Sequence, residues 1–342
     1  MKKLLFLATA ALLMTACGNK KADDPIGDSG RTLRTENLLN NLIVQGDSGV
    51  YLFGHQDDTA YGIGWMADYA NDSTIHQRSD VKSVCNDFPA LLSFDVATQQ
   101  QSDSLNMSGI PFFRIRQDVI AHFDRGGAVS LSWTIDKGNP SDKEIDRIAQ
   151  FINSLVTPYG VKVPVIFRLR GAFTKQLWQR VYQRMADNEV VNILYAYANQ
   201  ADADEERYLE RYPGDDIIDL LGVDCYCQAE DADTTQIADY TTRLDKSLTM
   251  VCDIAKKRHK AVALTETGYE CIKTKDWWTK TLAPILAKHP ISYVLLWRNA
   301  HDRINHYFAP YPGQQSASDF VLFYNDPKTL FLQDINGLYL KK

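Results

Sequence analysis

The stretch from residue 263 to residue 270 places a carboxylate at a position suited to catalysis. Its apolar and β-branched residues predict a buried strand, Glu266 stands at the C-terminal end of that strand, and Gly268 follows. A carboxylate buried without a partner is strongly destabilising, so such a group is either functional or paired. We predict that Glu266 is catalytic, and a structural ion pair is the alternative.

Two residues at the end of the last predicted strand suit the recognition of a sugar. Trp297 is followed directly by Arg298. An indole face can stack on the apolar face of a pyranose, and a guanidinium group can hold hydroxyl groups in a fixed fork. We therefore predict that Trp297 and Arg298 bind substrate, with a core tryptophan beside a rim arginine as the alternative.

Two other strand ends carry candidates for the same site. Asp224 and Tyr226 are two residues apart, so strand alternation places them on one side, where they could position a nucleophile and contact a sugar ring. A structural bond from Asp224 to the backbone is the alternative. His55 follows the first predicted strand, where it could bind a substrate hydroxyl or cap a loop, and both interpretations stay open.

Eight apolar runs of β type recur along the chain with amphipathic stretches between them, which is typical of βα units and a parallel sheet. They are residues 50–54, 90–95, 128–133, 163–168, 191–196, 217–224, 261–266 and 291–297. Helical spacing is visible between them, as at Ile145, Ile148 and Ile152. The pattern predicts an α/β fold of the (β/α)8 TIM-barrel class, whose active face is formed by the C-terminal ends of the strands.

Length and charge limit the possible partners. The 342 residues suit one barrel with a leader, and the formal charge of -6 without a long basic run gives no footprint for nucleic acid. No glycine-rich nucleotide fingerprint follows any predicted strand. We expect a monomer that needs no cofactor and acts on a neutral or small partner.

The first 16 residues have the pattern of a secretory leader, with Lys2 and Lys3 before an apolar run that is too short to span a bilayer. Ala16 directly before Cys17 resembles a bacterial lipoprotein signal. We predict a lipidated Cys17, a flexible tether over residues 17–34 and one domain over residues 35–342, in a protein held at the cell envelope on the periplasmic face or the cell surface. A plain signal peptide with an incidental cysteine is the alternative.

The remaining cysteines and several histidines are predicted to have structural or surface roles. The cysteines lack zinc-type spacing, so we predict buried thiols with at most one disulfide and no metal site: Cys85, Cys225, Cys227, Cys252 and Cys271. We place His76, His122 and His289 on the surface.

With these positions assembled, the chain resembles glycoside hydrolase family 26, the β-mannanases, in the form carried by Bacteroides-type lipoproteins. The matching motifs are residues 53–65, 164–168, 211–219, Leu264-Thr-Glu-Thr-Gly268, Leu296-Trp-Arg-Asn-Ala-His-Asp302 and 306–313. The resemblance implies that Glu266 is the nucleophile on the seventh strand. It also places His55, Asp224, Tyr226, Trp297 and Arg298 around the sugar on the non-reducing side of the cut.

The fourth predicted strand departs from the family pattern. The family continues from Phe-Arg into Pro-x-His-Glu, whose glutamate is the general acid/base, whereas this chain has Leu169-Arg170-Gly171 after Phe167 and Arg168. Arg170 cannot take that role, because a guanidinium group stays protonated. Asp95 and Asp136 could reach in from neighbouring strands. The loops after the second, third and fourth strands look cut back relative to the family.

Two functions remain open. The first is a lipoprotein that cleaves β-1,4-mannosidic bonds in mannan or manno-oligosaccharides by retention, with Glu266 as the nucleophile. The second is a catalytically impaired relative that retains the cleft and binds mannan.

Overall fold

The computed structural model describes residues 24–68, 78–99, 102–136, 139–227 and 232–341. The predicted leader, Cys17, the first part of the predicted tether and His76 lie outside the described residues. The expectations of cleavage and lipidation therefore stay predictions.

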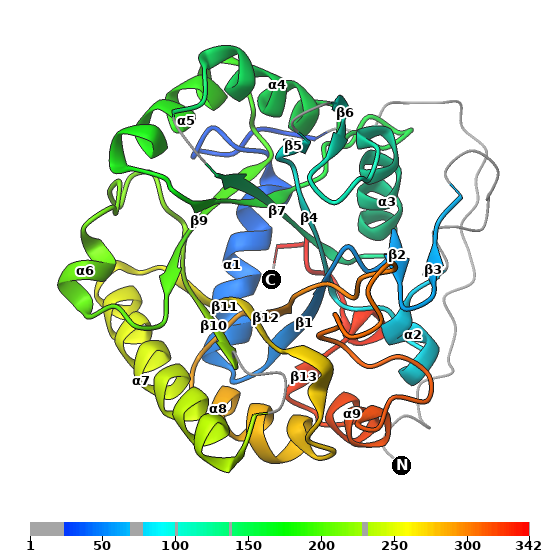
Figure 1. Cartoon of the computed structure of the whole chain (residues 1–342). Helices are drawn as coiled ribbons and strands as arrows, with labels where there is room; N and C mark the ends of the chain where they lie inside the picture. The colour runs from blue at the N-terminus through cyan, green and yellow to red at the C-terminus, as the bar shows by residue number, and fades with distance from the viewer. Residues whose placement is uncertain (1–23, 69–77, 100–101, 137–138, 228–231, 342) are drawn as a thin grey trace.

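Eight parallel strands close into a barrel, and the predicted (β/α)8 fold is confirmed (Figure 1). The strands are β1 (Tyr51–Gln56), β4 (Leu91–Asp95), β7 (Ala128–Ile135), β8 (Val165–Gly171), β9 (Ile193–Gln200), β10 (Leu220–Cys227), β11 (Ala261–Tyr269) and β12 (Tyr293–Leu296). They pair in chain order, and β12 pairs with β1 to close the ring. The short strand β13 (Thr329–Leu330) adds to β1. Each strand overlaps one of the eight apolar runs.

Helices occupy the intervals between the strands and surround the barrel (Figure 1). In chain order they are α1 (Leu33–Asp47), α2 (Asp80–Cys85), α3 (Phe112–Asp124), α4 (Asp142–Asn153), α5 (Lys175–Asp187), α6 (Glu205–Leu209), α7 (Thr234–Arg258), α8 (Ala283–Leu286) and α9 (Ala317–Tyr324). The helix α4 begins with a capping box formed by Ser141 and Glu144, which satisfies backbone N–H groups of its first turn.

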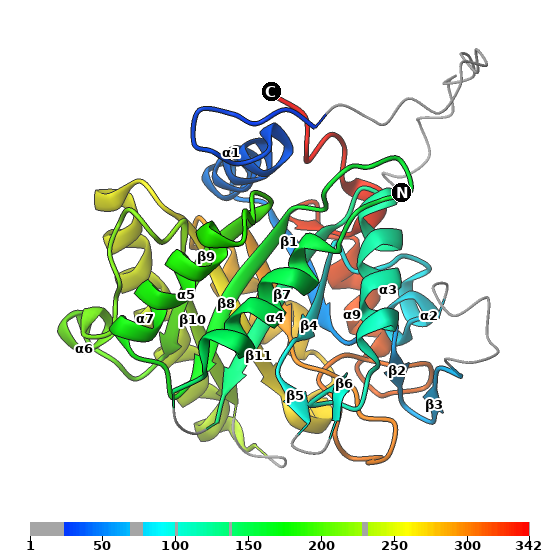
Figure 2. The ribbon, with the colours of Figure 1, turned by 90° about the horizontal axis from the view of Figure 1, so that it is seen from above.

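Small and apolar side chains fill the lower part of the barrel. One buried cluster combines small residues of several strands, such as Ala128, Ala196 and Ala263, with Leu38 and Leu42 of α1. The helix α1 therefore closes the N-terminal end of the barrel, and the C-terminal tail lies beside it (Figure 2). The polar ends of the strands are left at the opposite face.

Residues 24–34 contact the barrel. The carboxylate of Asp24 pairs with Arg34 at 2.6 Å, and Arg31 forms two hydrogen bonds with Asp219, which follows α6. The backbone N–H of Thr32 donates to Val191. Residues 24–34, predicted as part of a flexible tether, are thus held against the barrel by charge pairs and backbone hydrogen bonds.

The three loops expected to be cut back relative to the family differ in structure. The helix α4 begins at Asp142 soon after β7, and α5 begins at Lys175 soon after β8. The segment after β4 is different, because it forms a hairpin from β5 (Thr98–Gln99) and β6 (Ser102–Asn106) before α3. A second hairpin, β2 (Tyr61–Gly62) with β3 (Trp65–Met66), follows β1.

The prediction that His122 and His289 are surface residues was wrong. His122 is 1% exposed and lies 3.3 Å from the carbonyl oxygen of Ala90, and its burial lowers the pKa of the imidazole to about 4. His289 is 9% exposed, with Nε2 at 2.9 Å from Asp245 Oδ1. A nearby carbonyl or carboxylate satisfies an imidazole nitrogen, so a histidine in a helix or loop can be buried.

The thiol prediction agrees with the structure. Cys85, Cys225, Cys227 and Cys271 are buried thiols, and Cys252 is half-buried.

Candidate active site

Glu266 lies at the C-terminal end of β11, and a β-bulge turns its side chain into the barrel. The register between β10 and β11 runs from Val223 beside Leu264 to Asp224 beside Glu266, so Thr265 is an extra residue on β11. A bulge of this kind reverses the facing of every later side chain. Gly222 makes room for it, because a Cβ there would lie 2.3 Å from Thr265 Cγ2.

Two arginines and a tyrosine hold the Glu266 carboxylate. Arg168 donates to Oε2, Arg170 donates to Oε1 at 2.6 Å, and the Tyr226 hydroxyl also donates to Oε1. The side chain of Glu266 is 1% exposed. Burial, and then the adjacent Glu266 carboxylate, raise the pKa of the Tyr226 hydroxyl well above its ordinary value, so this group remains a donor.

Arg168 joins Glu266 to Asp224 inside the barrel. Its Nη1 donates to Asp224 Oδ1 at 2.6 Å, and the Thr265 hydroxyl donates to the same oxygen at 2.7 Å. Burial opposes the charge of Arg168, but the carboxylates of Asp224 and Glu266 outweigh it and raise the pKa of the guanidinium above its ordinary value. With Arg170, the cluster contains two positive and two negative charges.

Arg170 stands at the end of β8, two residues after Arg168 on the same side of the strand. Its side chain is 21% exposed, whereas that of Arg168 is 2% exposed. Gly171 follows with a φ of 76°, and a Cβ there would lie 2.6 Å from the carbonyl oxygen of Ile135. The chain then turns into α5, so a guanidinium is the last inward group of β8.

Neither alternative carboxylate is available as an acid beside Glu266. Asp95 is fully buried and accepts hydrogen bonds from the backbone of Ala97 at 2.7 Å and from the hydroxyls of Ser132 and Thr134 at 3.0 and 2.5 Å. Its Oδ2 lies 3.9 Å from Nη1 of Arg170. Asp136 is exposed beyond the end of β7.

Aromatic rings surround the carboxylate on one side. The ring of Trp297 lies edge-on to Tyr226 with centroids 6.0 Å apart, and it also contacts His306 and Phe308 at 5.3 Å. Trp297 is partly exposed, so its ring can contact a bound molecule. Gly268 allows this packing, because a Cβ there would lie 2.3 Å from the Phe308 ring.

Arg298 belongs to a second polar cluster, formed with the loop that follows β1. It donates to the Tyr61 hydroxyl at 2.9 Å, and that hydroxyl donates to Asp57 Oδ2. Asp57 is 0% exposed, and its burial raises the pKa of the carboxyl to about 6. The hydrogen bond from Tyr61 and the charge of Arg298 lower this pKa, but burial has the larger effect. The chain Asp57–Tyr61–Arg298 fixes the position of the guanidinium.

His55 is buried at the end of β1, and its Nδ1 lies 2.7 Å from Asp58 Oδ1. This contact fits the alternative in which His55 caps the loop after β1. Of the predicted site residues, the structure brings together Glu266, Asp224, Tyr226 and Trp297, while Arg298 and His55 contact the β1 loop.

Sequence reasoning gave no functional role to Arg168, Asp57 or Tyr61, and it considered Arg170 only to exclude it as the general acid/base. The signal for Arg168 and Arg170 was present, because residues two apart at a strand end share a face. Within the part of the chain that the structure describes, no three His, Cys, Asp or Glu side chains are grouped in a way that could hold a metal ion.

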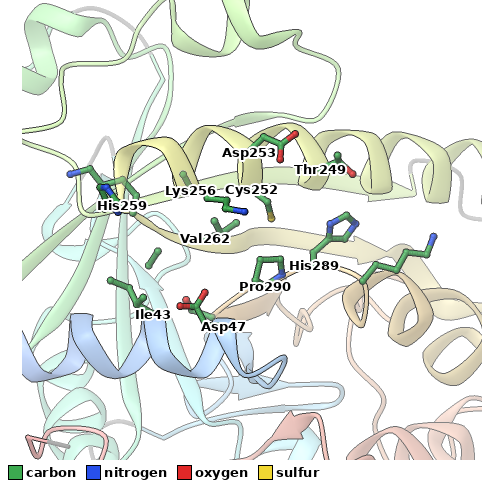
Figure 3. A pocket seen from close by; sticks show the side chains of 15 residues that line it. Ile43, Asp47, Thr249, Cys252, Asp253, Lys256, His259, Val262, His289 and Pro290 are labelled. Atoms are coloured by element: carbon green, nitrogen blue, oxygen red, sulfur yellow. The ribbon is translucent and has the colours of Figure 1, made fainter.

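A cavity of about 670 Å³ opens at the opposite end of the barrel (Figure 3). It is lined from α1, the end of α7 and residues 288–292, and its lining includes Asp47, Lys256 and His289. None of the predicted site residues lines it. The cavity is therefore separate from the site around Glu266.

Comparisons with known proteins point to one family. The family described as "Glycosyl hydrolase family 26" matches residues 138–271, which include the whole of β8, β9, β10 and β11. A solved GH26 β-mannanase from Bacteroides ovatus is 39% identical, with a TM-score of 0.82, and the match covers 91% of this chain and 98% of that one. A solved GH26C from Muricauda is 25% identical with a TM-score of 0.74, covering 91% and 94%.

A curated relative, the mannan endo-1,4-β-mannosidase of Bifidobacterium adolescentis, is 29% identical over 92% of this chain. The chain spans 36% of the length of that relative.

We predict that Asp57→Asn changes how stability depends on pH. The folded-state pKa of about 6 lies above the ordinary 3.8, so Asp57 favours the folded state below about pH 4 and this contribution is lost as pH rises through 6. The free energy of unfolding of the wild type should fall by about 3 kcal/mol more than that of the variant across this range. Urea unfolding at pH 4, 5, 6 and 7 measures the difference. Asp103→Asn, at a side chain that is 89% exposed, is the matched control, and equal slopes for Asp57→Asn and wild type would contradict the prediction.

Proposed function

Because the chain belongs to glycoside hydrolase family 26, we propose that it acts on β-mannan or manno-oligosaccharides and cleaves β-1,4-mannosidic bonds with retention of configuration. The observation that carries the proposal is the position of Glu266, an inward carboxylate at the C-terminal end of a barrel strand, held by Arg168 and Tyr226. Catalytic groups of barrel enzymes occupy that face.

Glu266 is the proposed nucleophile. Its carboxylate forms ion pairs with two guanidinium groups, and the hydrogen bonds from Arg168, Arg170 and Tyr226 fix the direction of its oxygens. An ionised, oriented carboxylate can attack C1 of a sugar and form an ester.

Trp297 and Arg298 are the proposed sugar contacts. The partly exposed Trp297 ring stands beside Tyr226, within reach of a pyranose whose C1 faces Glu266. Arg298 is oriented by Tyr61 and Asp57, and it keeps further N–H groups for hydroxyls. Asp224 acts indirectly, because it fixes Arg168 and thereby the nucleophile.

A specific observation favours the second candidate function, an impaired enzyme that binds mannan. A retaining glycosidase needs a second carboxyl group about 5 to 5.5 Å from the first, to protonate the leaving oxygen. Here the group that faces Glu266 from β8 is Arg170, and Asp95 accepts hydrogen bonds from Ala97, Ser132 and Thr134. Loss of general acid/base help lowers rates by about 100- to 10,000-fold.

We predict that the glycosyl-enzyme forms on Glu266 from an activated donor. A dinitrophenyl leaving group needs no protonation, so dinitrophenyl β-mannobioside should give a burst of phenolate and a trapped ester, while hydrolysis of plain mannan is weak or absent. Stopped-flow absorbance and intact-protein mass spectrometry measure the burst and the adduct. Both should vanish in Glu266→Ala. Turnover of plain mannan at about tens per second would show instead that a second carboxyl group takes part.

We predict that the protein binds sugar even if it lacks catalytic activity, because stacking of a sugar on the Trp297 ring does not require a general acid. We expect calorimetry to detect manno-oligosaccharide binding by the wild type, and Trp297→Ala to weaken it by about tenfold or more through lost ring contact. Tyr159→Ala removes an aromatic ring that is 68% exposed in the loop between α4 and β8, and it should bind like the wild type. Equal affinity in Trp297→Ala would contradict the assignment, and a folded wild type that binds no sugar at millimolar concentration would contradict both functions.

We also propose that the protein is a monomer attached to the cell envelope by a lipid on Cys17. In the described part of the chain no helix has the length and apolar character to cross a membrane. The proposal rests on the apolar leader followed by Ala16 and Cys17.

Labelled palmitate supplied to expressing cells should enter the wild type and not Cys17→Ser, because the thiol is the attachment point. Label that persists in Cys17→Ser would refute the anchor.

A further inference from the structure

Arg170 depends on the charge of Glu266, and the proposed reaction removes that charge. In the free protein its Nη2 donates to Glu266 Oε1 at 2.6 Å. When Glu266 attacks a sugar, the carboxylate becomes a neutral ester. The guanidinium of Arg170 then loses its ion-pair partner while it remains mostly buried, with 21% of the side chain exposed.

Among the residues that the structure describes, the two other carboxylates near Arg170 cannot replace Glu266 as that partner without giving up their own contacts. Asp95 Oδ2 lies 3.9 Å from Arg170 Nη1, and Asp95 already accepts from Ala97, Ser132 and Thr134. Asp224 is held by Arg168 at 2.6 Å and by Thr265. A mostly buried cation without a partner is unfavourable, so an anion bound beside Arg170 is held more tightly once the glycosyl-enzyme forms.

The geometry of a guanidinium group selects the kind of anion. Its planar fork of N–H donors matches the oxygens of phosphate and binds them in pairs. Arg170 is the last inward side chain of β8, and it contacts the proposed nucleophile directly. An anion held by Arg170 therefore lies close to the sugar carbon that Glu266 attacks.

Resting on the function proposed above, we propose that inorganic phosphate is the acceptor, so that the protein transfers β-mannosyl groups to phosphate and Arg170 binds that phosphate. In the first step Glu266 attacks C1, the bond from C1 to the leaving oxygen breaks, and dihydrogen phosphate gives that oxygen its proton. In the second step an oxygen of the resulting hydrogen phosphate attacks C1, and Glu266 leaves as a carboxylate. The product is a β-mannosyl phosphate, and no water is consumed.

Phosphate can take both roles of a second carboxyl group, which are to protonate the leaving oxygen and to assist attack on the glycosyl-enzyme. It titrates near neutrality, so it can donate a proton as an acid would, and as an anion it needs no general base to attack. Arg170 regains an ion pair with Glu266 when the carboxylate is released. The same cation that excludes a general acid at β8 therefore suits an acidic, anionic acceptor.

The test uses the purified full-length protein with dinitrophenyl β-mannobioside and inorganic phosphate. The adduct on Glu266 is followed by mass spectrometry, and its release is timed with and without phosphate. We expect phosphate to speed release by about 100-fold, the order of a general acid/base contribution, and phosphorus NMR to detect β-mannobiosyl phosphate. Manno-oligosaccharides with phosphate should yield β-mannosyl phosphates, whereas sulfate, which carries no proton near neutral pH, should not support cleavage.

Variants separate this inference from the proposed function. Arg170→Gln should reduce the ratio of release rates with and without phosphate to about one, and Arg170→Lys, which keeps the charge, should retain part of that ratio. Arg116→Gln makes the same charge change at an exposed position on α3 and should keep the wild-type ratio. Circular dichroism confirms that each variant is folded.

An adduct whose release ignores phosphate, or an unchanged ratio in Arg170→Gln, overturns the phosphate acceptor and leaves the nucleophile assignment standing. A wild type that forms no adduct overturns both.

Discussion

The buried guanidinium of Arg168 between Asp224 and Glu266 is the interaction on which the candidate site depends. It crosses the interior of the barrel from β8 to β10 and β11, and each carboxylate needs it because neither has enough water to stabilise its charge. Removing one member of such a buried set leaves the charges of its partners unpaired, which lowers the free energy of unfolding by about 3 to 5 kcal/mol. The set therefore constrains the side chains that can be placed around it, including Thr265 and Tyr226.

The barrel beneath this set is built to accommodate it. Small residues such as Ala196, Gly222 and Ala263 line the interior below the charged layer, and α1 closes the far end with leucines. Because the lower barrel is sealed by apolar packing, the polar strand ends are confined to one face. The bulge at Thr265 then aligns Glu266 with Asp224 in that face. Function and packing are thus separated along the barrel axis.

Arg170 gives the site its individual character. A general acid must release and regain a proton, and a guanidinium does neither at ordinary pH. The same group forms an ion pair with Glu266 in the free protein and loses that ion pair once Glu266 is esterified. Chemistry that avoids a protein acid, through a good leaving group or an acidic anion as acceptor, is consistent with this arrangement. Binding through Trp297 is independent of it.

The sequence by itself determined the eight strands, their parallel order in a barrel, and the placement of Glu266, Asp224 and Trp297 at strand ends, because hydrophobic periodicity is a local property of the chain. Only the tertiary structure decided which way Glu266 points. Alternation from Ala261 and Ala263 would direct Thr265 inward and Glu266 outward, and the bulge between β10 and β11 corrects this. The sequence also did not predict the burial of His122 or the pairing of Arg170 with Glu266. Both depend on partners far away in the chain, which local patterns do not encode.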